Sequence, residues 1–163
     1  MLSSPKYSSR RQAGGHLRVV ILLSLLSLVT AQAQDKGFGI GVILGEPTGL
    51  SAKGWLQSNN AIDGGLAWSF RGTGYIHMHA DYLWHFPNAI RSSERFVPYA
   101  GPGIRLGGGK GGSVFGIRVA GGIAFWPRGA PIDVFVELAP IVDLAPTTEV
   151  SFNAGLGVRF FFK

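Results

Sequence analysis

The stretch VSFNAGLGVRFFF, residues 150–162, alternates between two kinds of side chain. Every even-numbered position in it is apolar, and the odd-numbered positions from 151 to 159 are small, polar or charged. A period of two is typical of a β-strand whose two faces meet different surroundings. The last segment of the chain is therefore predicted to be a long strand with one apolar face.

The same alternation recurs upstream, interrupted at short intervals by clusters of Gly, Pro and Asn. The predicted strands cover residues 36–45, 48–57, 61–70, 74–86, 95–106, 114–126, 131–144 and 148–162. The predicted turns lie at residues 45–47, 58–60, 71–74, 87–94, 107–113, 127–130 and 145–147. This pattern predicts an all-β fold of eight antiparallel strands joined up and down by short loops.

The polar face of these strands distinguishes two classes of β protein. In a soluble sandwich the apolar faces meet in a core and the polar faces meet water, which requires no small residues there. Here the polar face is rich in Gly and Ala. An eight-stranded barrel is just wide enough for side chains to fill, so small residues make room for long charged ones. We therefore predict a transmembrane barrel, closed so that no backbone group is left unpaired in lipid.

Aromatic residues mark one end of the predicted barrel. If the first strand runs outward, seven of them fall at the end that carries both termini: Phe38, Trp84, Phe86, Phe96, Phe125, Phe160 and Phe162. Such a girdle is typical of a boundary between membrane and water. The external loops are then predicted at residues 45–47, 71–74, 107–113 and 145–147.

The first 33 residues predict export. Four basic residues, Lys6, Arg10, Arg11 and Arg18, precede an apolar run at 19–29 and an A-x-A site at 31–33, which is typical of a secretory signal peptide cleaved before Gln34. The apolar run is shorter than the ~20 residues of a spanning helix. Without residues 1–33 the formal charge falls from +6 to +2, so the basic pI of the whole chain says little about its partners. We expect the barrel to occupy residues 34–163.

Nine ionisable side chains are predicted to point into the lumen. They are Lys53, Asp63, Asp81, Arg105, Arg118, Asp133, Glu137, Asp143 and Arg159. Because an unpaired buried charge costs several kcal/mol, this near-balanced set predicts a network of ion pairs. A narrow channel for small solutes is the alternative.

His77 and His79 are candidate metal ligands, because His-x-His presents two imidazoles on one strand face. The competing interpretation is that they line the polar interior and bond to acids opposite. A membrane-embedded lipid hydrolase is a further alternative, although its site would have to reach lipid and the chain has no G-x-S-x-G elbow.

The sequence contains no motif for binding a nucleotide phosphate or a nucleic acid. The stretch GGGKGGS, residues 107–113, lacks the phosphate-loop spacing. No interleaving of basic and aromatic residues indicates nucleic acid. We expect no cofactor and no enzymatic activity.

Several short segments of the sequence resemble those of a family of small outer-surface β-barrels that was long described as a domain of unknown function. They are GEPTGL at 45–50, AID at 61–63, LAWS at 66–69, HADYLWH at 79–85, PIVDLAP at 140–146 and NAGLGVRF at 153–160. The family is similar in build to the OmpA and OmpX transmembrane barrels. The resemblance implies fold and location only, because the family brings no catalytic residues.

The leading functional hypothesis is a non-enzymatic barrel in the outer membrane of a Gram-negative-type bacterium, with a structural or surface-binding role. Its expected partners are outer-membrane lipid, the barrel-insertion machinery and an extracellular ligand of unspecified kind. The insertion machinery is expected to recognise a terminal aromatic residue, and the sequence departs from this by ending with Lys163 after Phe162.

Overall fold

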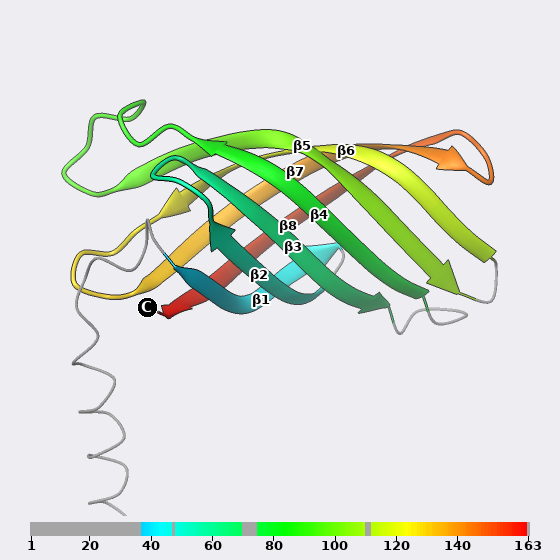
Figure 1. Ribbon diagram of the computed structural model, residues 1–163, viewed down its shortest axis with the longest axis horizontal. Coiled ribbons are helices and arrows are strands. Elements are labelled where there is room, and N and C mark those ends of the chain that lie inside the picture. Colours follow the sequence, from blue (N-terminus) through cyan, green and yellow to red (C-terminus); the bar gives the residue numbers. More distant parts are fainter. Residues whose placement is uncertain (1–36, 47, 70–74, 110–111, 163) are drawn as a thin grey trace, which may run out of the picture. The chain divides into compact units, whose positions relative to one another are not determined.

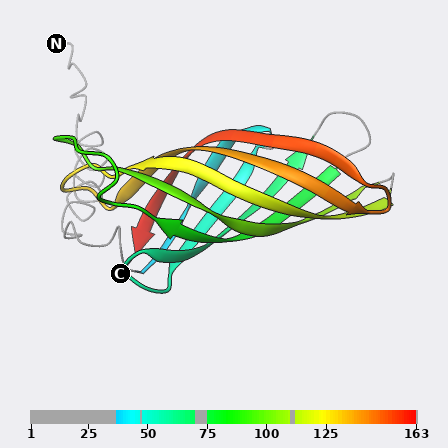
Figure 2. The ribbon, with the colours of Figure 1, turned by 90° about the horizontal axis from the view of Figure 1, so that it is seen from above.

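The computed structural model describes residues 37–46, 48–69, 75–109 and 112–162. Its strands are β1 (Phe38–Glu46), β2 (Gly49–Trp55), β3 (Asn60–Ser69), β4 (Tyr75–His85), β5 (Phe96–Gly109), β6 (Gly112–Phe125), β7 (Ile132–Ala145) and β8 (Glu149–Phe162). Each strand pairs with the next in antiparallel fashion, and β1 pairs with β8 to close the barrel (Figures 1 and 2). The predicted fold of eight antiparallel strands is confirmed. No helix in the described ranges has the length and apolarity needed to cross a membrane.

The strand boundaries need one notable correction. Residues 107–113 were expected to form an external loop, but β5 continues to Gly109, β6 begins at Gly112, and these two residues pair. β5 is also paired with β4 as far as Gly109. Because this backbone is paired on both sides, the glycine run continues the sheet despite its low strand propensity. Some predictions lie outside the described residues. They include the predicted signal peptide, Pro47, Phe70, the predicted turn at 71–74, and residues 110 and 111.

The two faces of every strand follow the predicted alternation. Large apolar side chains point outward from all eight strands, as with Val136, which is 59% exposed, and Phe152, which is 63% exposed. The charged side chains point inward, as with Lys53 and Arg159, each 1% exposed. The barrel is thus the reverse of a water-soluble protein, with its ionic groups inside and its apolar groups outside.

Part of the interior is apolar, which the sequence analysis did not anticipate. A cluster of buried side chains packs together inside the barrel, with Trp55 against it: Ile43, Leu83, Val97, Tyr99, Ala120, Ala124, Trp126, Phe135 and Ala139. Trp126 packs edge-on against Trp55, with ring centroids 5.6 Å apart. Since β2 and β6 both end here, these rings fill the lumen at the end of the barrel that carries the termini.

Inward-facing glycines allow the strands to approach closely. A Cβ built on Gly101 would collide with the backbone carbonyl oxygen of Tyr82. Gly121, on the neighbouring strand and facing outward, has no atom nearer to such a Cβ than 4.0 Å. The two positions therefore form a matched pair for testing luminal crowding.

We expect Gly101→Ala to lower the free energy of unfolding by about 1–3 kcal/mol, because a backbone atom cannot move aside as a side chain does. Gly121→Ala should leave the stability almost unchanged. Urea unfolding of the purified protein, followed by tryptophan fluorescence, measures both. Equal effects of the two substitutions would show that the lumen is not crowded at Gly101.

The ion-pair network in the barrel lumen

Strand register brings the luminal charges together. Lys53 of β2 pairs with Asp63 of β3, which pairs with Asp81 of β4. Asp81 pairs with Gly103 of β5, and Gly103 pairs with Arg118 of β6. Since directly paired residues point to the same side of a sheet, the four charged side chains and the glycine form one row around the inside of the barrel.

The first group of charges surrounds Arg159 and is named here the Arg159 cluster: Lys53, Asp63, Asp133 and Arg159. Arg159 forms an ion pair with Asp63, and its Nη1 lies 3.6 Å from Asp133 Oδ2. Lys53 Nζ lies at the same distance from that oxygen. Arg159 Nε also donates a hydrogen bond to Ser51 Oγ at 2.9 Å, and the guanidinium lies 3.8 Å from the centre of the Phe135 ring. Two cations thus face two carboxylates with almost no access to water.

The second group surrounds Arg118 and is named the Arg118 cluster: Asp81, Glu137 and Arg118. Arg118 Nη2 donates to Glu137 Oε1 at 2.6 Å, and its Nε lies 3.1 Å from Asp81 Oδ1. Tyr99 donates its hydroxyl hydrogen to Glu137 Oε2 at 3.1 Å. One guanidinium therefore holds carboxylates from β4 and β7 together across the lumen.

The remaining predicted charges, Arg105 and Asp143, lie nearer the end of the barrel opposite the termini. Their side chains are 13% and 10% exposed, and Arg105 Nη1 lies 3.2 Å from Asp143 Oδ2. Arg105 also donates to Ser151 Oγ at 3.1 Å. All nine candidate residues thus lie inside the barrel, and each is within ion-pair distance of at least one other.

Small residues create the space that these long side chains occupy. A Cβ on Gly103 would collide with Asp81 Oδ1, and one on Gly116 would lie 2.5 Å from Asp143 Oδ1. The enclosed space that remains beside Arg118 and Glu137 is about 10 Å³, close to the minimum for one water molecule. Side chains therefore fill this part of the lumen.

The two candidate metal ligands lie side by side in the lumen, but among the described residues only His79 belongs to a cluster of three potential ligands. His77 Nε2 lies 3.3 Å from His79 Nδ1 and 3.4 Å from Asn153 Nδ2. The grouping with metal-ligand geometry is instead His79 with Asp63 and Asp81, whose donor atoms lie within 4.8 Å of one another. Both carboxylates already face an arginine, Arg159 and Arg118 respectively. The guanidinium groups thus supply the positive charge that a metal ion would bring.

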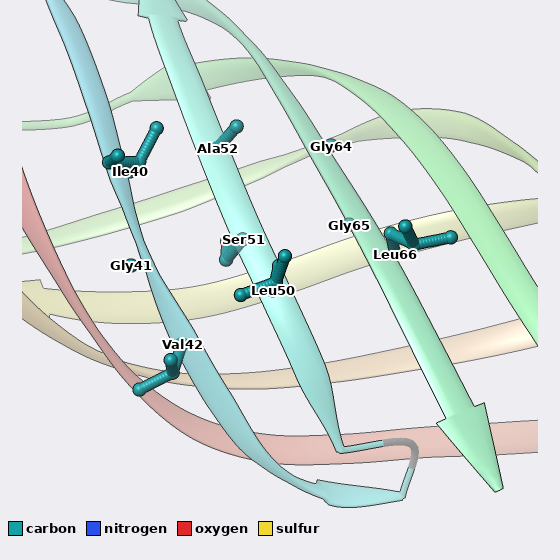
Figure 3. A pocket seen from close by; sticks show the side chains of 9 residues that line it. All are labelled: Ile40, Gly41, Val42, Leu50, Ser51, Ala52, Gly64, Gly65 and Leu66. Atoms are coloured by element: carbon teal, nitrogen blue, oxygen red, sulfur yellow. The ribbon is translucent and has the colours of Figure 1, made fainter.

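The outer face has a different character. Outside β1, β2 and β3, a groove of about 490 Å³ has an almost wholly apolar lining. Ile40, Leu50 and Leu66 project from these three neighbouring strands around it, while Ala52 and Gly64 leave its floor low (Figure 3). An apolar surface of this kind has no hydrogen-bonding groups to present to water, and it suits contact with hydrocarbon.

The comparisons with known proteins agree with this geometry at the level of fold. No protein-family model matches the chain, and no curated protein matches its sequence. The N-terminal β-barrel domain of Pseudomonas aeruginosa OprF is similar in structure, with a TM-score of 0.54 and 18% identity over 80% of this chain and 100% of that one. Ail, the attachment invasion locus protein of Yersinia pestis, matches with a TM-score of 0.42 and 15% identity over 78% of this chain and 99% of that one. The chain has the build of the eight-stranded OmpA- and OmpX-type barrels.

Proposed function

We propose that the protein is an integral outer-membrane barrel with a closed, salt-bridged lumen and a structural or surface-binding role rather than an enzymatic one. The observation that carries the proposal is the pairing of an apolar exterior on all eight strands with an ionic interior. Soluble monomers rarely expose contiguous apolar patches above a few hundred Å². Lipid is the solvent that makes this exterior favourable, and the closed sheet leaves no edge to be desolvated.

The ends of the strands support the same proposal. Phe38 pairs with Phe162, and Phe96 pairs with Phe125, at the end that carries the termini. Trp84 and Phe86 lie at this end and are 44% and 49% exposed. These residues would meet the headgroup level on the periplasmic side, where aromatic girdles are typical. On this proposal the partners are outer-membrane lipid and, during assembly, the barrel-insertion machinery.

The external connections are too short for a broad adhesive surface. Only two residues separate β1 from β2, five β3 from β4, two β5 from β6 and three β7 from β8. A ligand bound at the external end would therefore contact strand ends more than loops. This favours a structural role over extensive surface recognition.

Heat modifiability tests the proposal. The protein purified from membranes in detergent should migrate as a compact band on an unheated denaturing gel and as a slower band after boiling. It should also stay in the detergent phase on phase separation. A single heat-independent band, with the protein in the aqueous phase, would refute the proposal.

The channel alternative makes an opposite prediction about conductance. Because Arg118 bridges Asp81 and Glu137 across the lumen and rings fill the terminal end, we expect no steady conductance in planar bilayers. Steady single-channel currents that change with Arg118→Ala would favour the channel and overturn the closed lumen.

The lipid-hydrolase alternative gains no support from the geometry. His77 faces the lumen, 4% exposed, with His79 and Asn153 as its neighbours, so it is turned away from the surface that would meet lipid. Incubation with native outer-membrane lipids should release no fatty acid.

A further inference from the structure

The lengths of the connections are the reverse of those usual in outer-membrane barrels, where the periplasmic turns are short and the external loops long. The longest connection, residues 86–95 between β4 and β5, lies at the end that carries the termini, and so does the six-residue connection 126–131 between β6 and β7. Both loops extend at the same end as the C-terminus in Figure 1. The longest loop, on the proposed periplasmic side, is therefore a candidate for a binding function.

The two loops are tied to each other by specific contacts. Trp126 donates its backbone N–H to the carbonyl oxygen of Arg95 at 2.9 Å, and Arg128 Nη2 donates to the carbonyl oxygen of Ser93 at 2.6 Å. The Arg95 guanidinium also lies 5.0 Å from the centre of the Trp126 ring. The pair of loops is therefore a built surface, which we call the basic loop pair: residues 86–95 and 126–131.

The charge of the basic loop pair is unbalanced. It carries Arg91, Arg95 and Arg128, all exposed, against the single acid Glu94. Among the described residues, no ion pair joins any of the three arginines to a carboxylate, whereas each luminal arginine has at least one such partner. Exposed guanidinium groups without an acidic partner suit an anionic ligand.

A hollow of about 390 Å³ lies in the longer loop. Its lining combines Arg91, Arg95, Ser92 and Glu94 with the apolar side chains of Ile90 and Phe96. The loop also begins and ends at the aromatic girdle, between Phe86 and Phe96. The lining of the hollow is thus partly polar and partly apolar, and the hollow lies at the level of lipid headgroups if the proposed function holds.

We infer that the basic loop pair binds the phosphate of an anionic phospholipid headgroup in the periplasmic leaflet. Arg91 and Arg95 contact the phosphate oxygens at the hollow, Arg128 adds positive charge beside them, and Ile90 and Phe96 pack against the upper part of the acyl chains. Guanidinium groups suit this ligand because their planar N–H donors match phosphate oxygens in pairs. Each basic residue near an anionic lipid surface contributes about a fivefold gain in binding.

Lipid retention tests the inference. The protein is folded in detergent with equal amounts of phosphatidylglycerol and phosphatidylcholine. Native mass spectrometry then identifies the bound lipids and gives their relative amounts. The native protein should retain phosphatidylglycerol preferentially. Arg91→Gln and Arg95→Gln should each reduce that preference about fivefold. Ala89→Gln, in the same loop but not in the lining of the hollow, is the matched control and should leave it unchanged.

The outcomes separate this inference from the proposed function on which it rests. A heat-modifiable protein that retains both lipids equally, or whose preference survives both arginine substitutions, would refute the lipid site and leave the membrane barrel standing. Displacement of phosphatidylglycerol by inorganic phosphate at equal concentration would refute the lipid headgroup as the ligand. Retention of purified peptidoglycan in place of lipid would do the same. Loss of heat modifiability in the native protein would refute the membrane barrel itself.

Discussion

Replacing Arg159 by Ala is expected to lower the free energy of unfolding by about 3–5 kcal/mol, the usual cost of breaking a buried ion pair by removing one partner. The substitution leaves Asp63 and Asp133 facing each other's charge, with only Lys53 to offset them. It also removes the hydrogen bond to Ser51 and the contact with the Phe135 ring. Urea titration of the protein in lipid vesicles, read by the fraction that remains compact on an unheated gel, measures the loss.

Two control variants make this result specific. Arg105→Ala removes a comparable cation from the mouth, where the pair with Asp143 is partly exposed to water, so its cost should be less than half as large. The double variant Asp63→Asn with Arg159→Gln removes both charges of one pair and should be less destabilised than the two single variants added together. Additive losses, or equal losses for Arg159→Ala and Arg105→Ala, would show that the Arg159 cluster does not act as a buried network.

The second large effect is expected on the outer face. Leu156 lies midway along the apolar row of β8 and is 51% exposed, and Leu156→Arg should cost about 2–4 kcal/mol because it moves a cation into the centre of the hydrocarbon layer. Val150, on the same face near the beginning of the strand, is 63% exposed, and Val150→Arg should cost only about 0–1 kcal/mol. Urea unfolding in vesicles compares the two variants.

The contrast between these positions separates the two environments. In water both side chains are exposed on a strand, so both arginines would be tolerated to the same degree. A depth-dependent cost requires a low-dielectric layer centred on Leu156. Equal and negligible costs at the two positions would contradict a lipid-facing exterior.

The alternation of side chains was sufficient to predict the strands and their faces. A one-residue shift of register would turn every side chain to the opposite face, so a row such as 150–162 admits one arrangement only. The nine luminal charges followed from the same parity. Their partners did not, because pairs such as Arg118 with Glu137 depend on the stagger between strands, which no single strand reveals.

The alternation of inward and outward positions could also have predicted the apolar side chains that fill the lumen at the terminal end. Phe135 lies between inward-facing Asp133 and Glu137, and Trp55 follows inward-facing Lys53 by two positions. Their parity therefore places these rings on the luminal face, beside the charged side chains. The extent of β5 and β6 was harder to predict, because a glycine run has no side-chain pattern and its backbone pairing is set by the neighbouring strand β4.

The central claim is that the apolar face of the strands contacts lipid, and single-cysteine labelling tests it most directly. The chain contains no cysteine, so Leu156→Cys introduces one reactive site for a spin label. In lipid vesicles, the label should collide with dissolved oxygen, which concentrates in hydrocarbon, and be shielded from a water-soluble nickel chelate. Ready collision with the nickel chelate and little with oxygen would mean that this face is hydrated, and would contradict the account.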